Sequence, residues 1–223
     1  MKSKSKTEEV MGNTYYIARH GQTEWNILGK TQGHGNSPLT EKGLAQANEL
    51  AEGMDKYPLD MIFSSDLGRA MQTAEAVGKR FGIEVQPTEA LREMGFGEWE
   101  GRLIPEITEK YPEIYKTWRN EPHLAKIPGG ETLDVIKERL EKFIDELNEK
   151  YDNKNILLVS HSVTVRVLLL LMLDSPMKNI YRIKQDNTAL NIVEWRNYGP
   201  VVTKMNDTSH IKGDYKLNNS ALE

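Results

Sequence analysis

Three polar clusters of this sequence stand where a short apolar run ends, and their residue types suit the chemistry of phosphate esters. The clusters are Arg19-His20, Ser64-Ser65 and Ser160-His161. An imidazole nitrogen of His20 could attack phosphorus and form a phosphohistidine, provided that the ring is neutral and a hydrogen bond fixes its other nitrogen, most simply to a backbone carbonyl. Arg19 could bind two phosphate oxygens at once and keeps its charge.

Three further residues would complete this chemistry. Arg69 would add a second guanidinium to the phosphate pocket. His161 would donate to a phosphoryl oxygen and keep His20 neutral through like-charge repulsion. Glu93 is the candidate acid, because an alkoxide leaves poorly unless it is protonated, and a carboxyl group beside a phosphate dianion can supply that proton and then activate water. Together these residues predict phosphoryl transfer driven by positioning and electrostatics.

The elements that must position these residues are visible in the apolar pattern. Strands are predicted at residues 14–18, 59–63 and 155–159, each directly before one of the clusters, with a weaker strand at 83–86 and a hairpin from 189–195 and 200–205. Helices are predicted to begin at Thr40 and at Thr132. A third helix is predicted directly after Ser64-Ser65-Asp66, a cluster that can cap it, and a fourth contains residues 167–173. Alternating strands and helices predict an α/β fold with a mainly parallel sheet, whose sites form at the carboxyl ends of the strands.

Composition predicts one globular domain. The chain has 223 residues, of which 38% are hydrophobic and 28% charged, enough for a single core. We place this domain at residues 13–206, with a cap-like excursion at about 92–130 and polar tails at 1–12 and 207–223. The longest apolar run, 167–173, is far below the ~20 residues that span a bilayer, so no membrane association is predicted.

Charge and cysteine content narrow the function classes. The net charge is -4 and no basic stripe is present, which argues against a nucleic-acid partner. The chain has no cysteine, which excludes disulfides and Cys-ligated metal and favours a cytoplasmic location. His34, His123 and His210 lack metal-ligand spacing and are interpreted as surface residues. We therefore predict no metal site.

The motifs resemble those of the histidine phosphatase superfamily, which includes cofactor-dependent phosphoglycerate mutases and many small phosphatases. Residues 19–26 resemble its RHG signature, and residues 64–74 resemble its second arginine motif. The other matching segments, in sequence order, are 32–43, 91–101, 128–131 and 159–162. A bare RHG triplet would be weak evidence, whereas ordered segments across most of the chain are strong evidence.

The resemblance implies a three-layer αβα sandwich whose mainly parallel sheet contains one antiparallel strand, and no metal or organic cofactor. It implies that His20 is the nucleophile and Glu93 the proton donor. The phosphate pocket would be completed by Arg19, Arg69 and His161. The positions that would contact the phosphoryl group or substrate are Asn26, Gln32, Gly33 and Ser162, the last through its backbone.

The segment after Glu93 favours a phosphatase over a mutase. Mutases of this family usually carry Glu-Arg-His-Tyr-Gly at the acid, with basic residues that bind the carboxylate of phosphoglycerate. Here Glu93 is followed by Met94-Gly-Phe-Gly-Glu-Trp-Glu-Gly101, as in the phosphatase branch. Without the cationic clamp, water is the expected acceptor of the phosphoryl group.

The sequence thus predicts a phosphomonoester hydrolase that acts on a small phosphorylated metabolite, with residues 102–126 covering the leaving group. The alternatives are a cofactor-dependent phosphoglycerate mutase and a non-catalytic phosphate-binding module. The intact chemical positions disfavour the binding module. Neither the ester nor the oligomeric state follows from the sequence.

Overall fold

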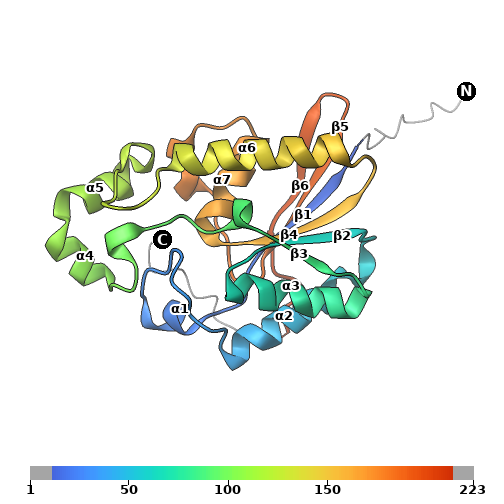
Figure 1. The fold of residues 1–223 in the computed structure, drawn as a ribbon, viewed down its shortest axis with the longest axis horizontal. Helices are drawn as coiled ribbons and strands as arrows, with labels where there is room; N and C mark the ends of the chain where they lie inside the picture. Colours follow the sequence, from blue (N-terminus) through green and yellow to red (C-terminus); the bar gives the residue numbers. More distant parts are fainter. Residues whose placement is uncertain (1–11, 213–223) are drawn as a thin grey trace, which may run out of the picture.

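The computed structural model describes residues 12–212, which form a six-stranded sheet between two layers of helices (Figure 1). The strand order is β3-β2-β4-β1-β5-β6. Neighbours from β3 to β1 pair in parallel, whereas β5 is antiparallel to both β1 and β6. The strands are β1 (Thr14–Arg19), β2 (Met61–Ser65), β3 (Val85–Thr88), β4 (Asn155–Ser160), β5 (Leu190–Arg196) and β6 (Gly199–Asp207). The predicted α/β sandwich with one antiparallel strand and a terminal hairpin is confirmed.

Alternating side chains of the strands build a core on each face of the sheet. Leu157 and Val159 of β4 face α2 (Glu41–Gly53) and α3 (Gly68–Phe81), whereas Ile156 and Leu158 belong to the core under α6 (Leu133–Lys150) and α7 (Ser162–Met172). Figure 1 shows these two helix layers on opposite sides of the sheet. Both layers are needed because a parallel sheet is apolar on both faces.

The helix that was predicted to begin at Thr132 is capped as expected, whereas the cap predicted for α3 is not found. The side chain of Thr132 accepts a hydrogen bond from the backbone at the start of α6, and Thr40 does the same at the start of α2, where a helix was predicted to begin. The predicted cap of α3 is wrong: its N-cap is Leu67, without a side-chain hydrogen bond. The polar groups of the cluster are used elsewhere, because Ser65 bonds to His161 and Asp66 pairs with Arg92.

One strand begins later than predicted. The expected strand covers residues 83–86, but β3 covers Val85–Thr88. The cause is the end of α3, where Gly82 adopts a left-handed conformation and the Ile83 N–H returns to the carbonyl of Gly78. This turn uses the first two residues of the apolar run before the chain can enter the sheet.

The excursion between β3 and α6 projects from one end of the molecule (Figure 1). It contains α4 (Ile104–Lys110), α5 (Pro112–Asn120) and three short turns, η2 (Glu89–Leu91), η3 (Gly97–Trp99) and η4 (Pro122–Leu124). Trp118 attaches it to the domain, since its buried ring packs edge-on against Phe96 and Tyr181 with centroids 5.7 and 6.1 Å apart. Beside it, α1 (Glu24–Leu28) leads into a short bridge between Lys30 and Leu103.

The chain ends fall partly outside the described residues. The predicted tails include residues 1–11 and 213–223, which lie outside them. β6 ends at Asp207, one residue after the predicted domain end, and Lys212 forms an ion pair with Glu52 of α2. No helix within residues 12–212 has the length and apolar character needed to cross a membrane.

Candidate active site

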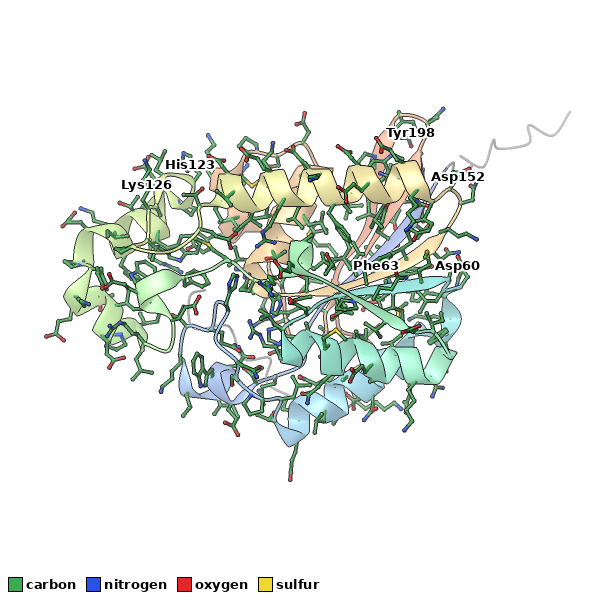
Figure 2. The ribbon with its side chains drawn as sticks, in the orientation of Figure 1. Asp60, Phe63, His123, Lys126, Asp152 and Tyr198 are labelled. Carbon is green, nitrogen blue, oxygen red and sulfur yellow. The ribbon has the colours of Figure 1, made fainter. Side chains whose placement is uncertain are left out.

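The three predicted polar clusters meet at one edge of the sheet. Asp60 and Asp152, which precede β2 and β4, lie at one end of the sheet, so the carboxyl ends of these strands point to the other, toward α4 and α5 (Figure 2). At that edge Nε2 of His161 lies 2.8 Å from Oγ of Ser65, and the rings of His20 and His161 have centroids 5.1 Å apart. The strand register therefore brings the clusters together.

His20 has the geometry of a neutral nucleophile. Its Nδ1 lies 2.7 Å from the carbonyl of Gly21, a bond in which Nδ1 donates, so the lone pair is on Nε2. Burial is the main cause that lowers the pKa of His20 well below its usual value, followed by the charges of Arg69 and Arg19. Gly21 is needed because a Cβ there would lie 2.4 Å from the carbonyl oxygen of Gly43.

The role of His161 in keeping His20 neutral stays a prediction. Burial, then the charges of Arg69 and His20, lowers the pKa of His161 well below its usual value. For His20 the main causes are burial and the two arginines, which disfavour the protonated ring. Within the part of the chain that the structure describes, Nδ1 of His161 has no hydrogen-bond partner.

Backbone carbonyls orient the two buried arginines. Nη1 of Arg19 donates to the carbonyl of Gln185 over 2.5 Å, while Nη2 and Nη1 of Arg69 donate to Gly33 and Gly35 over 2.7 and 2.8 Å. Burial lowers the pKa of Arg69 to about 10, which still leaves it charged at neutral pH. Because carbonyls fix the guanidinium group of Arg69 without neutralising it, its charge is available to an anion.

Glu93 lies against the first turn of α7. Its carboxylate accepts hydrogen bonds from the backbone N–H groups of Met94, Val163 and Thr164 over 2.9, 3.2 and 3.2 Å. Its own carbonyl accepts from Nε2 of His34 over 2.9 Å, so His34, predicted to be a surface residue, also fixes this segment. The helix terminus supplies donors that have no partner inside the helix.

The two predicted amide ligands are held by their oxygens. Oδ1 of Asn26 accepts from the N–H of Thr23 over 3.0 Å, and Oε1 of Gln32 accepts from the hydroxyl of Thr23 over 3.0 Å. Their NH₂ groups are therefore the atoms left to donate, which suits a phosphoryl oxygen. Ser162 is the first residue of α7, and Gly33 acts through its carbonyl on Arg69.

One cavity of about 40 Å³ unites eight of the nine predicted site residues. The exception is His161, whose ring neighbours that of His20. The predicted residues that line the cavity are Arg19, His20, Asn26, Gln32, Gly33, Arg69, Glu93 and Ser162. The lining residues that the sequence did not predict are Lys30, Thr31, Phe96 and Val163. Their only signal is sequence position, since each lies within or beside a predicted motif.

Three positioning residues were also missed. Nδ2 of Asn187 donates to the carbonyl of His20 over 3.0 Å. Arg139 donates to the carbonyls of Ala90, Arg92 and Glu93 and so fixes the acid-bearing segment. The carboxylate of Glu100 accepts from the N–H groups of His34 and Phe96 over 3.0 Å each. In residues 12–212, no three His, Asp or Glu side chains are grouped so that they could hold a metal ion.

Comparison with known proteins gives one family. Residues 15–208 match the family model of the histidine phosphatase superfamily (branch 1). Phosphoserine phosphatase 1 from Hydrogenobacter thermophilus is 32% identical over 87% of this chain and 92% of its own, and "Probable phosphoglycerate mutase GpmB" from Yersinia pestis is 33% identical over 88% and 94%. A phosphoserine phosphatase mutant from Entamoeba histolytica, solved in complex with phosphoserine, superposes with a TM-score of 0.81 at 30% identity over 90% of this chain and 100% of that one.

Proposed function

Since the chain belongs to branch 1 of the histidine phosphatase superfamily, we propose that it hydrolyses monoesters of small phosphorylated metabolites through a phosphohistidine at His20. One observation carries the proposal. A neutral imidazole, with Nδ1 fixed by the carbonyl of Gly21, lies in a buried cavity beside Arg19 and Arg69. This arrangement offers an unshared electron pair and two cations to a phosphate dianion.

In the first step the phosphate binds between Arg19 and Arg69, with the amides of Asn26 and Gln32 donating to its oxygens. Nε2 of His20 attacks phosphorus as the bond to the ester oxygen breaks. Glu93 transfers a proton to that oxygen, so the leaving group departs as a neutral alcohol. The positive charge on the phosphorylated imidazole is stabilised by the Nδ1 bond to the carbonyl of Gly21.

In the second step the carboxylate of Glu93 takes a proton from water as the water oxygen attacks phosphorus. The bond between phosphorus and Nε2 breaks, inorganic phosphate leaves, and the electron pair returns to His20. The acid of the first step is the base of the second, as microscopic reversibility requires. Each cycle therefore restores the starting protonation states.

Three features support this function over its alternatives. Residues 94–101 contain no Arg, Lys or His, so the acid segment lacks the clamp expected of a mutase. All five chemical positions are intact, which disfavours a module that only binds phosphate. The lack of cysteine and of a basic stripe supports a cytoplasmic enzyme of small esters, and phosphoserine, named for two relatives, is one such ester.

The test is turnover of aryl and alkyl phosphates by pure protein. We expect His20→Ala to abolish hydrolysis, and acid-quenched wild-type protein to carry one phosphoryl group on His20 by mass spectrometry. Glu93→Gln should slow alkyl esters by about 10²- to 10⁴-fold and slow 4-nitrophenyl phosphate far less, because that leaving group needs no proton. Wild-type rates in His20→Ala would refute the mechanism, and isomerisation of phosphoglycerate primed by a bisphosphoglycerate would identify a mutase instead.

A further inference from the structure

The cavity has a deep end and a mouth, which the exposure of its residues distinguishes. Arg19, His20 and Arg69, which surround the phosphoryl position, are exposed by no more than 2% of their surface. Lys30 lines the same cavity but is half-buried. A leaving group that extends from the deep end toward solvent passes the more exposed of the described lining residues, and Lys30 is the one cation among them.

The backbone around Lys30 is fixed on both sides. Its N–H donates to the carbonyl of Trp25 over 3.0 Å, and Thr31 exchanges hydrogen bonds with the carbonyl of Arg102 and the N–H of Gly101 over 3.0 and 2.8 Å. These bonds join the loop after α1 to the base of the cap-like excursion. The ammonium lies 5.9 Å from the centre of the Trp25 ring, which limits where the side chain can extend.

The charge of Lys30 is not balanced by a carboxylate of the protein. Within residues 12–212, no carboxylate lies within 4.0 Å of its Nζ. By contrast Lys110, at the end of α4, pairs with Glu98. Lys30 is also the one lysine among the described residues that line the cavity. A lysine that lines the cavity, and whose ammonium lacks an acidic partner in the described part of the chain, suits an anionic group on the leaving group.

We propose that Lys30 binds a carboxylate of the leaving group, so that the preferred substrates are phosphate esters of hydroxy acids and hydroxy amino acids. This inference rests on the proposed function. It places the cation for the carboxylate in the loop after α1, and not in the segment after Glu93 where mutases of the family have theirs. Phosphoserine and phosphoglycerate, in the names of the relatives, both carry such a carboxylate.

The test compares esters that differ in the carboxylate. The pairs are phosphoserine with phosphoethanolamine, and 3-phosphoglycerate with glycerol 3-phosphate. In the wild type we expect the carboxylated member of each pair to have the higher kcat/KM. Lys30→Gln should lower kcat/KM for that member by about 10- to 100-fold, mainly through KM, and leave its partner and 4-nitrophenyl phosphate within about twofold. Lys30→Arg should retain most of the preference.

The matched control is Lys79→Gln. Lys79 is an exposed lysine in the last turn of α3 that does not line the cavity. Its substitution should leave all four values unchanged. An equal loss on both members of a pair in Lys30→Gln, or a wild type that hydrolyses 4-nitrophenyl phosphate but does not prefer the carboxylated esters, would overturn the inference and leave the proposed function intact. Absence of turnover on 4-nitrophenyl phosphate and all four esters would overturn both.

Discussion

Gly33→Ala tests whether the loop that orients Arg69 depends on Glu100. Gly33 has φ of 53°, in the left-handed region, and a Cβ there would lie 2.1 Å from Oε1 of Glu100. That oxygen accepts hydrogen bonds from the N–H groups of His34 and Phe96, so the carboxylate cannot move without losing them. The substitution therefore strains the backbone and breaks the link between the arginine loop and the acid-bearing segment.

The expected cost has two parts. The left-handed backbone costs an alanine about 1 kcal/mol relative to glycine. Displacing the carboxylate of Glu100 from two N–H groups costs about 1 kcal/mol each, at the lower end for charged acceptors because Glu100 is only half-buried. The sum is about 3 kcal/mol in the free energy of unfolding, or a fall in Tm of about 6 to 12 °C for a chain of this length.

Gly29→Ala provides the control. Gly29 has φ of 67°, and no atom would lie within 4 Å of a Cβ added there, so alanine at this position should cost only the backbone part, about 1 kcal/mol. Chemical denaturation of both variants, and of Gly33→Ala in a Glu100→Ala background, measures the coupling. We expect the cost of Gly33→Ala to fall to about 1 kcal/mol when the Glu100 side chain is removed, since the close contact is then relieved. Equal costs for Gly29→Ala and Gly33→Ala, or an undiminished cost in the Glu100→Ala background, would refute this account.

Two further predictions concern the protonation of the site and the support of the acid. The pKa values of His20 and His161 are lowered from 6.5, so the unfolded chain binds protons that the folded chain does not bind as pH falls below 6.5. The ligand-free protein should therefore lose stability from pH 7 to 5. In His20→Gln the free energy of unfolding should depend less steeply on pH, by up to about 1.4 kcal/mol per pH unit. An identical slope in a denaturation series would show that His20 is not held neutral. Arg139→Gln should slow the hydrolysis of alkyl phosphates about tenfold and that of 4-nitrophenyl phosphate little, because Arg139 orients the segment that carries Glu93. Equal slowing of both kinds of ester would indicate general damage to the fold.

The convergence of the three polar clusters could be predicted because it combines two local signals with one general rule. Each cluster ends an apolar run, and the carboxyl ends of parallel strands meet at one edge. Asn187 could not be predicted in this way. Asn187 contacts His20 although the two residues are 167 positions apart in the sequence. Because β5 runs antiparallel to β1, the residues that precede β5, Asn187 among them, lie at the carboxyl end of β1.

The incorrect expectations share a physical cause, which is competition from tertiary contacts. Ser65 and Asp66 have the residue types of a helix cap, but Ser65 bonds to His161 and to the N–H of Leu67, and Asp66 pairs with Arg92. Lys30 was missed for a related reason. A lysine in a turn is usually solvated, and its residue type does not reveal that the chain folds a cavity around it.

The charges that line the cavity explain why the arginines are fixed by carbonyls. At the deep end of the cavity the guanidinium groups of Arg19 and Arg69 carry two positive charges, whereas Lys30 lies at the mouth. A phosphate dianion balances the charge of the two guanidinium groups. If a carboxylate replaced the carbonyls of Gly33 and Gly35 as the partner of Arg69, it would fix the guanidinium equally well but would compete with the phosphate for its charge. The carbonyls therefore orient Arg69 as firmly as a buried ion pair would, and its charge can act on the phosphate of the substrate.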